Sequence, residues 1–177
     1  MKRFLLFLAF GLALAVSACT RPQIDLPNRD VPVTQEAAQR FEEKIAQLKQ
    51  APGGDIKITF TESEITSYIN IKLAENNLPV QRPTIWFSSG KIYIKGRFET
   101  SGIPLKGDAV LVLMLSVQDG KLNLKVEKAV VGRVPVPQSV LDELTSLANE
   151  RLTTITGPLP VKELQILEGE AILILSR

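Results

Sequence analysis

The side chains of this sequence that could do acid–base chemistry are carboxylates, which occur in close pairs. The pairs are Glu42/Glu43, Glu62/Glu64, Asp142/Glu143 and Glu168/Glu170. Two carboxylates placed on either side of a glycosidic bond can hydrolyse it. Each pair also has a structural explanation. We expect Glu42/Glu43 on a charged helix and Glu62/Glu64 in a helix cap. We expect Asp142/Glu143 near a helix N-terminus, where acids suit the dipole, and Glu168/Glu170 on either side of a turn glycine.

Other groups on which enzymes commonly rely are missing from the sequence. It contains no histidine, which is the commonest general base and metal ligand. Its serines form no Gly-x-Ser-x-Gly motif, and it has no Gly-rich phosphate loop or Walker motif. We therefore expect a protein that is not an enzyme and that binds no metal and no cofactor.

The N-terminus has the pattern of a secretory signal peptide. Basic Lys2 and Arg3 come first, an apolar run from Phe4 to Val16 follows, and small residues precede Cys19. The apolar run is shorter than the roughly 20 residues that a membrane-spanning helix needs. We expect residues 1–18 to direct export.

Cys19 is the only cysteine of the chain, so it has no disulfide partner. The last four residues of this segment, Val16-Ser17-Ala18-Cys19, resemble the lipobox of bacterial lipoproteins. That resemblance implies cleavage before Cys19 and acylation of this residue. The expected location is the extracytoplasmic side of the cell membrane or outer membrane, with the chain anchored to the bilayer through acylated Cys19. The alternative is a plain signal peptide with an incidental cysteine.

The charge balance bears on which partners the exported chain could bind. Removal of residues 1–18 takes away two basic side chains and no acid, so 21 − 2 = 19 basic side chains remain against 19 acidic ones. A chain with no net charge lacks the electrostatic attraction that drives binding to phosphate backbones. We therefore expect no nucleic-acid partner.

Three segments are expected along the chain: the signal peptide 1–18, the acylated Cys and a Pro-containing tether 19–34, and a single α+β domain 35–177. Prolines at 22, 27 and 32 favour extended chain over residues 20–34. At ~3.1 Å per residue these fifteen residues reach at most about 45 Å.

Within the domain, hydrophobic periodicity predicts helices from Gln35 to Gln50, from about Glu62 to Asn76, and after Pro137. Thr34 is a suitable cap for the first helix, and Thr61-Glu-Ser-Glu64 is a capping box for the second. One strand precedes that box, two hairpins occupy the middle of the chain, and two strands end it. No run of βαβ units is present, so a curved antiparallel β-sheet packed against two to three helices is expected.

The second hairpin raises a question because Asp108 to Val117 is apolar on both faces, whereas its partner alternates. A two-residue turn at Asp119-Gly120 sets Leu113 opposite Val126 and Val112 opposite Glu127. One face is then wholly apolar, and the other bears an apolar stripe rimmed by charge. The stripe has three explanations: a second packed layer, a surface for a partner or membrane, or the wall of a lipid-sized cavity.

The order of elements resembles the LmeA-like group of bacterial lipid-binding proteins. The matching pieces are FTESEITSYI, GKIYIKGRF, VQDGKLNLKVEKAVVG, RVPVPQSVLDEL and LPVKELQILEGEAILIL, which cover most of residues 55–177. This resemblance implies a tubular lipid-binding (TULIP-like) fold, in which acyl chains lie between a rolled sheet and a long helix. The expected apolar cavity residues are Ile65, Ile69, Leu73, Ile92, Ile94, Phe98, Leu111, Leu113, Leu115, Leu122, Leu124, Leu144 and Leu147.

Two functions follow from these features. The first is a membrane-anchored lipoprotein of the cell envelope that binds or transfers a phospholipid or other acyl lipid. The second is a scaffold with a filled core that displays Trp86, Tyr93, Val112 and Met114 to another envelope protein. Lys95, Arg97, Lys106 and Lys125 either meet lipid headgroups or lie on ordinary solvated strand faces.

Overall fold

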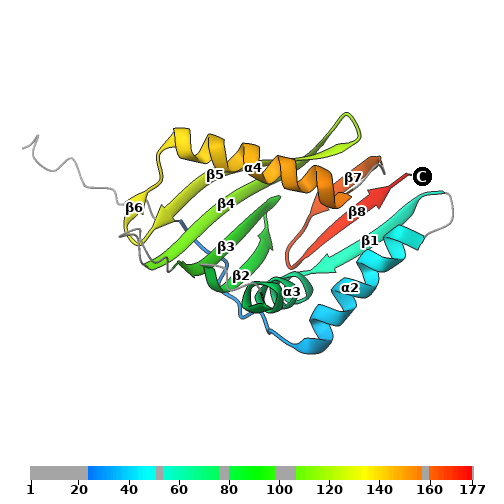
Figure 1. The fold of residues 1–177 in the computed structure, drawn as a ribbon, viewed down its shortest axis with the longest axis horizontal. Helices are drawn as coiled ribbons and strands as arrows, with labels where there is room; N and C mark the ends of the chain where they lie inside the picture. The colour runs from blue at the N-terminus through cyan, green and yellow to red at the C-terminus, as the bar shows by residue number, and fades with distance from the viewer. Residues whose placement is uncertain (1–23, 51–53, 76–79, 99–106, 157–159, 177) are drawn as a thin grey trace, which may run out of the picture.

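The computed structural model describes residues 24–50, 54–75, 80–98, 107–156 and 160–176 (Figure 1). Its helices are α2 (Gln35–Gln50), α3 (Glu62–Glu75) and α4 (Gln138–Thr156). Its strands are β1 (Ile56–Thr61), β2 (Val80–Ser88), β3 (Lys91–Phe98), β4 (Gly107–Gln118), β5 (Lys121–Val131), β6 (Val134–Pro135), β7 (Val161–Ile166) and β8 (Glu170–Leu175). The predicted signal peptide and Cys19 lie outside the described residues.

The α+β class with antiparallel pairing is confirmed, but the strands form two sheets and not a single one. A three-stranded sheet has the order β1-β8-β7, and a five-stranded sheet has the order β2-β3-β4-β5-β6. Figure 1 shows α4 along β5 on one side of the molecule, and α2 and α3 near β1 on the other. The pairing of the first strand with the last one separates the small sheet from the meander.

The three-stranded sheet has one buried face, to which β1 contributes through its alternation of apolar and polar residues and β8 through a continuous apolar run. Ile58 and Phe60 of β1 lie opposite Leu173 and Ala171 of β8, and their side chains are buried on one face. Phe41 of α2 packs on Phe60, with 5.2 Å between the ring centroids. This face is the core between the small sheet and α2.

Both predicted hairpin turns are confirmed. Ser89 and Gly90 have φ of 51° and 75°, and Asp119 and Gly120 have φ of 50° and 71°. Two successive positive φ angles define the type I′ turn, whose twist matches that of the strands it joins. The expected pairs follow, among them Leu113 with Val126.

One predicted pair is wrong: Val112 lies opposite Lys128 and not opposite Glu127. The register shifts between Val112 and Leu113, where a bulge gives β5 one extra residue. Glu127 is that residue, and its carboxylate lies 2.6 Å from Lys91 Nζ on β3. The sequence did not predict this bulge, because the apolar–polar pattern of β5 is compatible with the pairing either with or without it.

The two predicted caps are confirmed. Thr34 Oγ1 accepts a hydrogen bond from the backbone N–H of Ala37 at 3.1 Å. In the capping box, the N–H of Glu64 donates to Thr61 Oγ1 at 3.3 Å, and the N–H of Thr61 donates to Glu64 Oε2 at 3.0 Å. These bonds satisfy amides that a helix start leaves unpaired.

Candidate functional site

The five-stranded sheet has two faces that differ in what covers them. We call the face with Ile92, Ile94, Leu111 and Leu113 the inner face, because Leu113 is buried there against Leu141 of α4. The outer face is the opposite one.

Most of the predicted cavity residues lie on the inner face or beside it. Around Leu113 and Leu141, half-buried apolar side chains pack at Ile92, Ile94, Leu111 and Leu124. Ile65 and Ile69 of α3 join Ile92 and Ile94 in a second cluster around buried Ile85 and Phe87. Leu122 packs against the core of the three-stranded sheet. The inner face is therefore contacted from one end by α3 and from the other by α4.

Helix α4 is fixed along the free edge of β5 by two polar side chains. Strand β6 pairs only with Val130 and Val131, so the earlier part of β5 has an open edge. Asn149 accepts a bond from the N–H of Leu124 and donates one to its carbonyl, both at 2.8 Å. Thr145 Oγ1 accepts a bond from the N–H of Val126 at 3.0 Å. The helix thus replaces the missing strand.

These contacts fix which way the rest of the helix points. Residues of an α-helix succeed one another at about 100°, so Leu141 is turned by about 80° from Asn149, and Leu144 by about 60° more in the same direction. Asn149 reaches the edge of β5 and Leu141 points onto the inner face. Leu144 is therefore turned past Leu141, toward the space over β4 and β3.

The apolar stripe of α4 is only half buried. Leu141 is 4 % exposed, whereas Val140, Leu144 and Leu147 are 41 %, 38 % and 53 % exposed. We call these last three residues the α4 stripe. Leu144, which was expected to close a cavity, is open on the side facing the inner sheet. Leu147, which was also expected there, is turned by about 200° from Asn149 in the same direction, so it points away from the edge of β5.

The remaining predicted cavity residues are Leu73, Leu115 and Phe98, of which Leu115 lies on the inner face opposite Leu124. Leu73 of α3 and Leu115 of β4 are half-buried, but neither belongs to an apolar cluster found in the described parts of the chain. The side chain of Phe98 lies outside the described residues.

The strip expected for a protein partner is on the outer face and is mostly covered. Trp86, Tyr93 and Val112 lie side by side across β2, β3 and β4, and Met114 follows on β4. Trp86 and Val112 are only 8 % and 4 % exposed, whereas Met114 is 38 % exposed. Since two of the four residues are buried, this strip offers a partner little open apolar surface.

The N-terminal strap, residues 24–34, fastens to this side of the domain. Trp86 Nε1 donates to the carbonyl of Arg29 at 2.9 Å, and Ser63 Oγ donates to the carbonyl of Pro32 at 2.7 Å. The N–H of Thr34 donates to Ser67 Oγ at 3.0 Å. The later part of the predicted tether is thus bonded to the folded domain and is not free.

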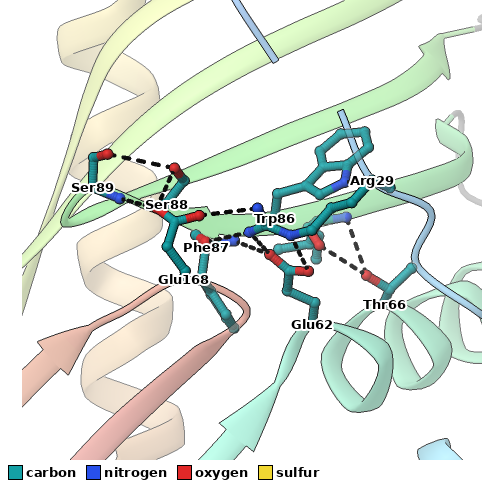
Figure 2. A network of polar contacts seen from close by, with 9 residues as sticks. Arg29, Glu62, Thr66, Trp86, Phe87, Ser88, Ser89 and Glu168 are labelled. Atoms are coloured by element: carbon teal, nitrogen blue, oxygen red, sulfur yellow. Dashed lines mark hydrogen bonds and ion pairs between the residues drawn. The ribbon is translucent and has the colours of Figure 1, made fainter. Parts of the chain in front are cut away.

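Arg29 is the centre of the polar network in Figure 2. Its Nε donates to buried Glu62 at 3.0 Å, its Nη1 to Glu168 at 3.0 Å, and its Nη2 to the carbonyl of Phe87 at 2.6 Å. The hydrogen bond with Glu62 contributes most to raising the pKa of the Arg29 guanidinium. The Ser88 hydroxyl and other donors, Arg29 included, lower the pKa of Glu168. One side chain therefore joins the strap to both sheets and to α3.

The pair Glu62/Glu64 is used structurally. Glu62 Oε1 accepts the N–H of Phe87 at 2.6 Å, at the free edge of β2. Glu64 turns to α2, where Lys44 Nζ lies 2.7 Å from its Oε2. Burial raises the pKa of Glu64, but the bonds from Lys44 and from the N–H of Thr61 outweigh it, so the pKa is lowered. The two carboxylates have different partners and do not act as a facing pair.

A small hollow lies between α2 and α3, away from α4. Glu42, Ile45, Ala46 and Tyr68 line its volume of about 160 Å³. Ligand pockets usually have volumes of about 300–1,000 Å³, so this hollow is small for a lipid.

Within the described ranges, no group of His, Cys, Asp and Glu side chains could bind a metal ion. Among the described residues, no helix is long and apolar enough to cross a membrane.

Comparison of the chain with protein-family models, with curated protein sequences and with solved structures found no match.

Proposed function

We propose that this chain is an exported, membrane-anchored protein of the cell envelope that binds an acyl lipid between α4 and the inner face of the five-stranded sheet. It acts without catalysis, as a carrier. The arrangement is TULIP-like, with a long helix beside a curved sheet. The observation that carries the proposal is the α4 stripe, whose three apolar side chains stay exposed where a packed core would have buried them.

An acyl chain suits this place for a physical reason. Full burial of a Val or Leu side chain is worth about 1.5–3 kcal/mol, and each buried CH₂ of a ligand about 0.8 kcal/mol. Leu144 and the half-buried residues of the inner face present apolar surface on two sides, and Leu147 and Val140 continue that surface around the helix. A flexible apolar ligand would remove both from water at once.

The first test is native mass spectrometry of the chain from Thr20 onward, purified without detergent, followed by lipid extraction. This chain keeps every described residue and lacks the expected acylation site. The expected result is a population heavier by the mass of a phospholipid or another acyl lipid. A bare protein mass, with no uptake of an apolar dye, would refute the carrier proposal. A copurified protein without acyl chains would favour the scaffold instead.

A pair of variants locates the ligand. Leu144→Gln with Leu147→Gln places two polar groups on the stripe, and we expect the bound lipid to be lost. The matched control is Val33→Gln with Leu167→Gln, two residues that are 53 % and 42 % exposed away from α4. The control should retain the lipid. Equal retention by both variants would place the ligand elsewhere.

Membrane anchoring is tested separately on the full-length chain in bacterial cells. We expect Cys19→Ser to abolish incorporation of radiolabelled fatty acid and to move the protein from the membrane fraction to the soluble one. Unchanged labelling would contradict acylation at Cys19. This result is independent of lipid binding by the folded domain.

A further inference from the structure

The outer face of the five-stranded sheet concentrates positive charge. Its basic side chains belong to β3 and β5, and they are Lys91, Lys95, Arg97, Lys121, Lys125 and Lys128. The acidic side chains of β3, β4 and β5 on this face are Asp108 of β4 and Glu127 of β5. The chain after residue 18 has equal numbers of basic and acidic side chains, so the excess of basic side chains on this face is balanced by an excess of acidic side chains elsewhere in the chain.

The lysines of β5 are the most available part of this charge. Lys91 Nζ lies 2.6 Å from Glu127, and Lys95 Nζ lies 3.8 Å from Asp108, so these two are partly neutralised. Lys121, Lys125 and Lys128 are exposed, and no ion pair to them is found in the described parts of the chain. Lys125 lies directly opposite Met114, the exposed apolar residue of this face.

The strap places the chain's N-terminal end on this same side. The carbonyl of Arg29 is bonded to Trp86, whose side chain is on the outer face, whereas Leu141 of α4 packs on the inner face. The expected acylation site, Cys19, precedes Arg29 by 29 − 19 = 10 residues. At ~3.1 Å per residue, ten residues of extended chain span about 30 Å at most. An anchor at Cys19 would keep the outer face within that distance of the bilayer.

We propose that the outer face docks on the surface of an anionic phospholipid bilayer. Lys121, Lys125 and Lys128 attract the headgroups, and Met114 enters the headgroup layer between them. The α4 stripe then points away from the anchoring bilayer, toward whatever delivers or receives the lipid. This inference rests on the membrane anchoring in the proposed function and does not require a ligand at α4.

The test is co-sedimentation of the chain from Thr20 onward with vesicles, so that no acyl anchor contributes. The vesicles are phosphatidylcholine alone, or an equimolar mixture of phosphatidylcholine and phosphatidylglycerol. Each basic residue near an anionic surface strengthens binding by about fivefold, so Lys121→Gln, Lys125→Gln and Lys128→Gln together should weaken it by about 100-fold. Binding should also fall between ~0.1 M and ~1 M salt, because the Debye length shrinks from ~10 Å to ~3 Å.

The matched control removes the same charge elsewhere, with Lys57→Gln, Lys72→Gln and Lys162→Gln on β1, α3 and β7. This control should bind the mixed vesicles nearly as well as the unchanged chain. Equal loss in both triple variants would show that net charge alone governs binding and would overturn the proposal. Equal binding to both kinds of vesicle would do the same.

A third variant separates this proposal from ligand binding. Leu144→Gln with Leu147→Gln should still bind the mixed vesicles, and the lysine variant should still carry lipid in native mass spectrometry. Loss of vesicle binding in the leucine variant, with binding kept by the lysine variant, would assign docking to α4 and refute docking by the outer face. Absence of bound lipid with intact vesicle binding would refute only the carrier function.

Discussion

The difference in exposure among the leucines of α4 leads to a prediction that does not depend on any ligand. Leu141 is 4 % exposed and packs against Leu113, so Leu141→Ala should lower the free energy of unfolding by about 2–5 kcal/mol. Leu147 is 53 % exposed, so folding gains only about half of the free energy that full burial of this side chain would give. Leu147→Ala should cost about 1 kcal/mol or less, and Leu144→Ala about 1–2 kcal/mol.

Urea unfolding of delipidated protein measures all three variants on one scale. The midpoint should shift strongly for Leu141→Ala and weakly for the other two, with m unchanged, because none of the variants alters the surface exposed on unfolding by much. A cost for Leu144→Ala or Leu147→Ala equal to that of Leu141→Ala would mean that the stripe is ordinary core. That result would refute the reasoning that α4 leaves an open apolar face.

The ligand adds a second readout to the same experiment. A ligand at about 100 times its Kd stabilises the folded state by about 2.7 kcal/mol. Addition of a fatty acid or lysophospholipid below its micelle concentration should therefore raise the midpoint of the unchanged chain. The same addition should have little effect on the variant Leu144→Gln with Leu147→Gln.

Three further predictions concern single contacts. The pKa of Glu64 is lowered from 4.5, so its ionised carboxylate stabilises the folded state above pH 4.5, and this stabilisation is lost as pH falls through the folded-state pKa. Glu64→Gln cannot form the ion pair with Lys44. We therefore expect this variant to flatten the acid side of a plot of urea midpoint against pH. Asn149→Ala leaves both backbone groups of Leu124 without their partner and should cost about 1–3 kcal/mol in urea unfolding, with faster hydrogen exchange of that amide as the specific sign. Gly120→Ala places a Cβ at φ 71° and should cost about 1–2 kcal/mol, whereas a cost near zero would contradict the type I′ turn.

The local features of the fold could be predicted from the sequence because they depend on short-range chemistry. Asp119-Gly120 specified its turn, and the turn specified the pairs next to it, such as Leu113 with Val126. The capping box at Thr61 and Glu64 could be recognised for the same reason. In each case the residues that decide the structure lie within a few positions of one another.

The features that the sequence did not reveal depend on distant contacts. Nothing near Arg29 indicates that it bonds Glu62, Phe87 and Glu168, because these partners come together only when the chain has folded. The use of residues 29–34 as part of the domain was missed for this reason. A signal did exist for α4: Thr145 and Asn149 are polar residues four positions apart along the border of the apolar face of the helix. This is the spacing of side chains that could bond an exposed strand edge.

The polar contacts of α4 also explain why its stripe stays open. A rotation of the helix that buried Leu144 and Leu147 would bring Leu141 out and would break the bonds of Thr145 and Asn149 to β5. The three bonds contribute about 1 kcal/mol each, and exposure of Leu141 would cost about 1.5–3 kcal/mol. Burial of the remaining exposed part of Leu144 and Leu147 would return only about 1–3 kcal/mol. The edge of β5 therefore holds the helix in an orientation that leaves the stripe exposed, and a ligand that covers the stripe gains this apolar surface without first displacing a packed side chain.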